Sequence, residues 1–331
     1  MNDDLSLDEN GSALSLARKP YRILCLSGGG YRGLYTAFLL ETLEERAGRK
    51  LGEVFDLIAG TSIGGILAIG LAAGVPAARL RTAFEEHGEA IFRGVLHTGS
   101  RGLRLPWRGW LWRKYSGVGL ARTIAHILED SPGISTMSGL RTPVLISTVD
   151  VTNNSPRVFT QEGEDGRLAL VDVAMATAAA PGFFPERRVG ESNFIDGGLV
   201  ANAPDMLALS RALSQGHDLS DIHALSVGTA GGAGGETPRR ASGLGTLLRA
   251  KKLFQLTIAA QEKLAIASAA SLLKNRYIRL NVEPSAQQMR ALGLDKTGLT
   301  ARETLKLLAD NTMRGAEEGE QAQLRMILQS T

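Results

Sequence analysis

Short apolar runs alternate with stretches of helical periodicity along most of this chain. Compact runs of aliphatic and β-branched residues predict strands at positions 21–27, 54–59, 144–149, 157–160, 222–227 and 277–281. Apolar residues spaced three and four apart predict helices over 34–47, 66–73, 77–92, 171–180, 205–213, 244–273 and 300–317. Strand–helix units with short connections favour an α/β fold, with a mostly parallel central sheet and helices on both faces.

A tight turn joins the second predicted strand to its helix and reads Gly60-Thr61-Ser62-Ile63-Gly64. A serine on such a turn points its hydroxyl outward, and the flanking glycines let neighbouring backbone pass close by. The following helix brings unpaired N–H groups and the positive end of its dipole to the same place. The pattern predicts that Ser62 is a hydrolase nucleophile, although a serine that caps a tightly packed helix would read the same way.

A glycine loop, Gly28-Gly29-Gly30-Tyr31-Arg32-Gly33, follows the first predicted strand. Three consecutive glycines expose their amides, which could hold the oxyanion of an acyl-transfer reaction. The same spacing fits dinucleotide binding, but that fingerprint needs an acidic residue at the end of the second strand. Here Glu53 precedes that strand and Asp56 lies inside it. A test of NAD binding separates the two hypotheses, and we expect none.

Ser62 needs a base to activate it, and in a catalytic triad this base is a histidine late in the chain. His217 and His223 are late enough, but one lies in a polar turn and the other begins a strand. Asp196 is a better candidate, because it ends a short strand at Asp196-Gly197-Gly198 and can project from the edge of the sheet. The alternative for Asp196 is a turn residue that bonds its own backbone.

These three motifs, in this order, resemble those of the patatin-like phospholipases. The alanine-rich stretch 176–181 before Phe184-Pro185 and the segment 225–229 add to the resemblance. The resemblance implies a three-layer patatin-like fold and a Ser62–Asp196 dyad that cleaves lipid esters without a metal or a catalytic cofactor. It also implies an oxyanion hole at Gly28, Gly29 and Gly30, with the remaining motif glycines at Gly33, Gly60, Gly64, Gly197 and Gly198. Ser27 departs from the family, in which an aspartate often precedes the glycines.

The stretch 26–35 is more narrowly similar to the phospholipase effectors of bacterial CBASS antiphage systems. That similarity implies a cyclic dinucleotide as activator and membrane phospholipid as substrate. The alternatives are a lipase without nucleotide control and a non-catalytic module that senses nucleotide or binds membranes. Labelling of Ser62 by a fluorophosphonate would exclude the last. Whether identical chains associate stays open.

Composition limits which classes of protein and which cellular locations fit this interpretation. A net charge of +3 over 331 residues argues against a dedicated binder of nucleic-acid polymers. The single cysteine, Cys25, lies in the first strand and excludes a disulfide framework. With no signal peptide visible, we expect a cytoplasmic protein that associates peripherally with the inner membrane when active.

Two segments fall outside this regular pattern. Residues 1–19 are expected to form a flexible tail, and 20–331 a single domain. Within it, residues 93–122 contain all three tryptophans and no acidic residue, which suggests a mobile insertion. Tryptophan prefers the bilayer interface and basic groups bind anionic headgroups or nucleotide phosphates. The candidate contacts to membrane or activator are Trp107, Arg108, Trp110, Trp112, Arg113 and Lys114.

Overall fold

The computed structural model describes residues 19–92, 114–231, 246–319 and 321–329. Their eight strands form one sheet, in the order β5-β6-β3-β2-β1-β7-β8, and β4 pairs with β3. The strands are β1 (Tyr21–Leu26), β2 (Leu57–Thr61), β3 (Val144–Asp150), β4 (Ser155–Phe159), β5 (Arg187–Val189), β6 (Ser192–Asp196), β7 (Ile222–Val227) and β8 (Tyr277–Leu280). The five strands from β3 to β8 in this order are parallel, whereas β4, β5 and β6 are antiparallel to their neighbours.

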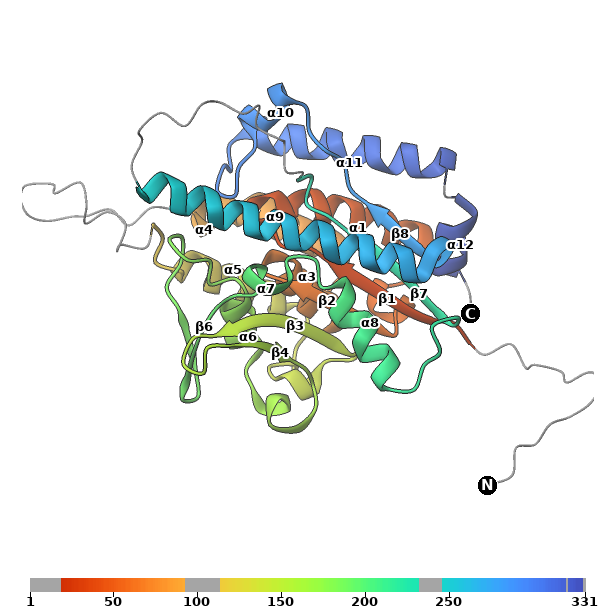
Figure 1. Cartoon of the computed structure of the whole chain (residues 1–331), viewed down its shortest axis with the longest axis horizontal. Helices are drawn as coiled ribbons and strands as arrows, with labels where there is room; N and C mark the ends of the chain where they lie inside the picture. Colours follow the sequence, from red (N-terminus) through yellow and green to blue (C-terminus); the bar gives the residue numbers. More distant parts are fainter. Residues whose placement is uncertain (1–18, 93–113, 232–245, 320, 330–331) are drawn as a thin grey trace, which may run out of the picture.

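Helices cover both faces of this sheet (Figure 1). The larger helices are α1 (Gly33–Ala47), α3 (Ile63–Ala72), α4 (Ala77–Ile91), α5 (Val118–Glu129), α6 (Leu170–Thr177), α8 (Asp205–Ser214), α9 (Thr246–Leu273), α11 (Leu299–Gly319) and α12 (Gln321–Gln329). Shorter helices are α2 (Leu51–Val54), α7 (Gly198–Ala201) and α10 (Ala286–Ala291), and short 3-10 turns lie at Gly30–Arg32, Met137–Gly139, Gly163–Arg167 and Lys274–Arg276. The predicted α/β architecture is confirmed.

Alternation along β1 explains the layers, because successive side chains of a strand point to opposite faces. Leu24 and Leu26 enter the larger core, which α1, α3, α4, α11 and α12 cover. Ile23 and Cys25 enter the smaller core beneath α8 and α9. The Cys25 thiol is therefore buried, as expected for an inward-facing strand residue.

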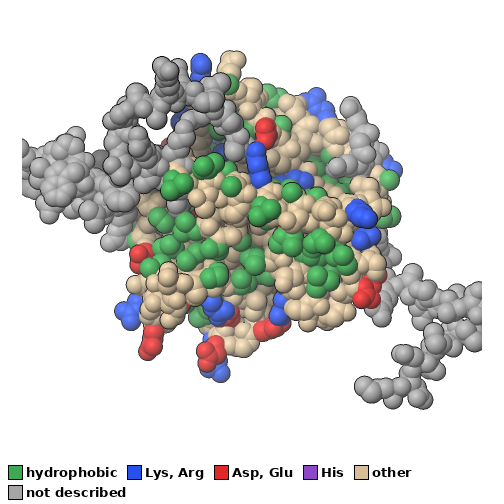
Figure 2. Space-filling model, viewed as in Figure 1, with side chains coloured by type: hydrophobic (Ala, Val, Ile, Leu, Met, Phe, Trp, Pro, Cys, Tyr) green, Lys and Arg blue, Asp and Glu red, His purple; other side chains and the backbone are tan. Residues whose placement is uncertain are grey.

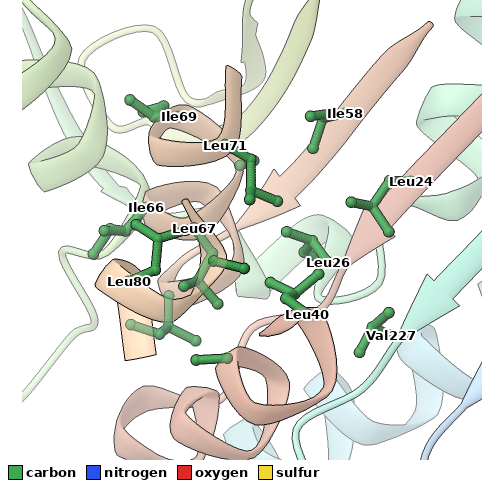
Figure 3. Packing of buried hydrophobic residues seen from close by; sticks show 14 of the residues in the cluster. Leu24, Leu26, Leu40, Ile58, Ile66, Leu67, Ile69, Leu71, Leu80 and Val227 are labelled. Atoms are coloured by element: carbon green, nitrogen blue, oxygen red, sulfur yellow. The ribbon is translucent and has the colours of Figure 1, made fainter. Parts of the chain in front are cut away.

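Helix α3 lies in the middle of the larger core, where Leu67 and Leu71 pack among Leu24, Leu26 and Ile58 (Figure 3). All ten of its residues are buried. A helix that is apolar on every side belongs in a core, which explains why this apolar run is not a membrane span. Its first turn is thereby held rigidly against the ends of β1 and β2.

Several local predictions were wrong. The apolar run 54–59 contains the end of a helical turn, α2, and β2 starts only at Leu57, because a buried helical turn and a buried strand have the same apolar composition. Most of the expected insertion, residues 93–113, lies outside the described residues. In the described part of 93–122, Tyr115 is buried and α5 starts at Val118. Gly117, with a φ of 79°, turns the chain into α5. Strand β5 and helices α10 and α12 were not predicted.

Candidate active site

Ser62 lies between β2 and α3 in a conformation that non-glycine residues rarely adopt. Its φ and ψ are 55° and −124°, and its side chain is buried. The neighbouring glycines make this turn feasible: a Cβ at Gly60 would overlap the Gly64 carbonyl, and one at Gly64 would overlap the Leu26 carbonyl. Strain of this kind persists only where the surroundings enforce it, and it is typical of functional sites.

Asp196 meets Ser62 across the sheet. The Ser62 hydroxyl donates a hydrogen bond of 2.6 Å to Asp196 Oδ2. The other carboxylate oxygen, Oδ1, accepts the Gly198 amide at 2.7 Å. The DGG turn therefore orients the carboxylate. Asp196 thus bonds the backbone of its own turn through one oxygen and contacts Ser62 through the other.

Burial raises the pKa of the Asp196 carboxyl to about 6, although the hydrogen bonds from Ser62 and the Gly198 amide favour the charged form. A carboxylate with this pKa is largely ionised at neutral pH and is still basic enough to accept a proton from a nearby hydroxyl. A serine and a base in direct contact are the minimum that nucleophilic acyl transfer requires.

The glycine loop lies against the same serine. A Cβ built on Gly28 would stand 3.2 Å from the Ser62 Cβ. The Gly28 amide, however, donates to the Asn202 carbonyl at 2.9 Å. Within the described chain the amides of Gly29 and Gly30 have no hydrogen-bond acceptor. Of the three amides expected to form an oxyanion hole, that of Gly28 is therefore already bonded within the fold, whereas those of Gly29 and Gly30 have no acceptor among the described residues.

Two polar side chains that the motifs did not identify, Thr177 and Asn202, support this arrangement. Thr177 Oγ1 accepts the Ser62 amide at 2.8 Å and donates to the Ser147 carbonyl at 2.6 Å. The Asn202 side chain donates to the Gly28 carbonyl at 3.3 Å and to Glu262 at 2.8 Å. Thr177 lies in the alanine-rich stretch 176–181, and Asn202 lies four residues after Gly198 of the DGG motif. Proximity to these motifs is the sequence signal that points to both residues.

Arg279 contacts Ser27, the residue at which this chain departs from the family pattern. Its guanidinium donates to Ser27 Oγ at 2.9 Å and to Ser226 Oγ at 2.7 Å, and it pairs with Glu262 at 3.1 Å. The serine therefore joins a buried network behind the glycine loop. An aspartate at this position would face the same cation.

Other candidates lie elsewhere. None of the four histidines in the described ranges bonds to Ser62 or Asp196; His217, for example, stacks on Tyr21 at 3.8 Å between ring centroids. The candidate contacts Trp107, Arg108, Trp110, Trp112 and Arg113 lie outside the described residues. Lys114 is described, and it pairs with Asp295 in the loop after α10. The positive charge of Lys114 is therefore already paired with a carboxylate of the same chain.

A mostly parallel sheet with a serine at a strand-to-helix turn in contact with a carboxylate is suited to acyl transfer. Residues 24–209, more than half of the chain, match the patatin-like phospholipase family. The chain belongs to this family.

Individual relatives agree with that assignment. The chain is 36% identical over 297 residues to a cGAMP-activated phospholipase of Pseudomonas aeruginosa, with 86% of each protein covered. It is also 40% identical over 235 residues to a cGAMP-activated phospholipase of Vibrio cholerae. That match covers 63% of this chain and 64% of the Vibrio protein. The solved structure of VipD from Legionella pneumophila shares the fold, with a TM-score of 0.50 and 14% identity over 95% of this chain and 69% of VipD.

Proposed function

We propose that this protein hydrolyses acyl ester bonds of membrane phospholipids, with Ser62 as nucleophile and Asp196 as general base. The observation that carries the proposal is the 2.6 Å hydrogen bond from a strained, buried serine to a carboxylate whose pKa is about 6. Family membership supports the lipid substrate.

The reaction has two steps in this proposal. Ser62 Oγ attacks the ester carbonyl while Asp196 Oδ2 takes the hydroxyl proton, and the Gly29 and Gly30 amides stabilise the oxyanion. The carbon–oxygen bond to the leaving alcohol breaks as Asp196 returns the proton to it, which leaves an acyl-serine. Water then attacks the acyl-serine, and Asp196 shuttles its proton back to Ser62. The products are a free fatty acid and a lysophospholipid.

Paired substitutions test the dyad. We expect Ser62→Ala and Asp196→Asn each to lower fatty-acid release from phospholipid vesicles by at least about a thousandfold. Matched controls are Ser210→Ala and Asp310→Asn, which change exposed residues on α8 and α11 and should retain full activity. Full activity in either dyad variant would refute the assignment.

Nucleotide control is the second part of the proposal. The relatives in Pseudomonas aeruginosa and Vibrio cholerae are named as cGAMP-activated, and the first is matched over 86% of its length. We propose that a cyclic dinucleotide likewise activates this chain, as in an antiphage effector acting at the membrane. Fatty-acid release should rise at least about tenfold with cGAMP or a related cyclic dinucleotide. Equal activity without any nucleotide would remove this part and leave the hydrolase.

A further inference from the structure

Helix α9 is unusually exposed for an apolar helix. Its 28 residues extend roughly 42 Å along the surface. Among the described helices, one segment is long and apolar enough to cross a membrane, and it is Gln255–Arg276, with a mean hydropathy of 1.2 and only 11% of that window buried. A core helix of this composition would be mostly buried. The inner side of α9 packs on α7, α8 and β8, so its outward face is the part left for another partner.

The outward residues of α9 form one continuous apolar line, which we call the α9 stripe. It consists of Leu253, Leu256, Ala260, Leu264 and Ala267, at spacings of three and four residues that keep them on one side of a helix. Leu253, Leu256 and Leu264 are 64%, 60% and 69% exposed. Figure 2 shows hydrophobic side chains gathered across the part of this face where α9 and α8 lie. Such a contiguous patch marks an interaction site.

The inner side of the same helix contacts the catalytic region. Gln261 donates to the Gly198 carbonyl at 2.9 Å, in the turn that orients Asp196. Glu262 accepts the Asn202 amide that also holds the Gly28 carbonyl. The chain enters α9 after β7 and leaves it just before the parallel strand β8, so α9 runs from the carboxyl edge of the sheet back to the opposite edge. Leu253 and Leu256 precede Gln261 and thus lie toward the edge that carries Ser62.

The charge of α9 favours an anionic partner. The helix contains Arg249, Lys251, Lys252 and Lys263 but a single acidic residue, Glu262. The Glu262 carboxylate faces inward, because it pairs with Arg279 and Asn202. A helix whose sequence combines apolar residues with an excess of basic ones is typical of helices that bind the interface of an anionic bilayer. A second copy of the same positive helix would be repelled.

We propose that the α9 stripe is the surface on which this enzyme sits on an anionic lipid bilayer, with the helix in the membrane plane and the Ser62 site beside it. The proposal rests on the lipid substrate proposed above. In this proposal the two faces of α9 act together. The outer face contacts lipid, and the inner face holds the turns around Asp196 and Gly28.

Binding to lipid vesicles tests the role of the α9 stripe directly. The measurement uses the Ser62→Ala variant, in which the lipid should not be hydrolysed. The probe is sedimentation with vesicles of phosphatidylethanolamine containing one quarter phosphatidylglycerol, with cGAMP present. Adding Leu256→Glu and Leu264→Glu should weaken the vesicle partition coefficient at least about tenfold, because two exposed leucines that would enter the bilayer are replaced by charges that anionic lipid repels. The matched control is Leu307→Glu, which changes a 51% exposed leucine on α11, over the opposite face of the sheet. It should bind like the parent.

The outcomes are distinct. Circular dichroism and the thermal midpoint establish that each variant is folded. Vesicle binding equal to the parent in the folded α9 variant would overturn the inference. A loss of self-association in that variant without lipid, measured by light scattering, would assign the stripe to a second copy and also overturn it. If Ser62 proves inactive on phospholipid while binding still depends on the stripe, the proposed function fails and the docking surface stands.

Discussion

Ser62 and Asp196 are 134 residues apart in sequence, and a 2.6 Å hydrogen bond joins their side chains at the edge of one sheet. In a triad, a third side chain orients the base. Here the Gly198 amide, bonded to the far oxygen of Asp196 at 2.7 Å, does so. The short DGG turn thus supplies both the proposed base and the amide that orients it.

The pH dependence of activity should report the ionisation of Asp196. Burial raises the pKa of this carboxyl to about 6, and only the ionised form can accept the Ser62 proton. We expect kcat/KM on a soluble short-chain ester to rise with pH, to reach a plateau above about pH 7, and to fall about tenfold by pH 5. Stopped assays across this range measure it. A flat profile from pH 5 to 8 would contradict Asp196 as the base.

The same pKa predicts a stability difference. The Asp196 carboxyl has a higher pKa in the fold, about 6, than its ordinary value of 3.8, so the fold binds this proton more tightly. The stability from this group is therefore present at low pH and is lost as pH rises through about 6. Asp196→Asn should raise the free energy of unfolding at pH 7 to 8 by up to about 3 kcal/mol, and the gain should shrink toward pH 4.

Urea unfolding at a series of pH values measures this difference. The exposed Asp310→Asn serves as control, with a change within about 0.5 kcal/mol. An Asp196→Asn protein less stable than the parent at pH 8 would show that burial of the charge is not what opposes stability here.

Thr177 should affect activity because its side chain accepts the backbone amide of Ser62, the proposed nucleophile. Thr177→Val keeps the shape but removes the acceptor of the Ser62 amide, which leaves that buried N–H unpaired. We expect a loss of about 1–3 kcal/mol in unfolding free energy and a lower kcat with little change in KM. Thr177→Ser keeps the oxygen and should restore both. Equal kcat in the valine and serine variants would remove Thr177 from the positioning of Ser62.

Gly28 should tolerate no side chain. A Cβ there would lie 2.5 Å from Asn202 Oδ1 and 3.2 Å from Ser62 Cβ, so Gly28→Ala must displace the glycine loop. Activity should fall at least about a hundredfold. The control, Gly315→Ala, has open space on the exposed face of α11 and should stabilise the protein by about 1 kcal/mol. Parent-like turnover in Gly28→Ala would show that the loop does not hold the oxyanion.

The sequence by itself predicted the fold class and the three motif turns. It did so because glycines, a small nucleophile and an acid at strand ends are local features, and strand and helix periodicities are local too. It gave no sign that 54–59 holds part of a helical turn, and it assigned residues 118–122 to an insertion, although they open α5. At 54–59 the apolar composition fits a buried helix as well as a buried strand, so only packing decides. Residues 118–122 were grouped with the tryptophan-containing stretch before them because they too contain no acidic residue.

Only the tertiary structure decided which groups meet. Gly28, Gly29 and Gly30 are alike in sequence, yet only the Gly28 amide donates to the Asn202 carbonyl, and the other two amides have no acceptor among the described residues. The apolar residues of 244–273 predict a helix and do not say which of them stay exposed. Exposure depends on how α9 lies over β7, β8 and α8, and that follows from contacts between segments far apart in the chain. Ser62 could be named from its own turn, whereas its bond to Asp196 required the sheet that brings β2 and β6 to the two sides of β3.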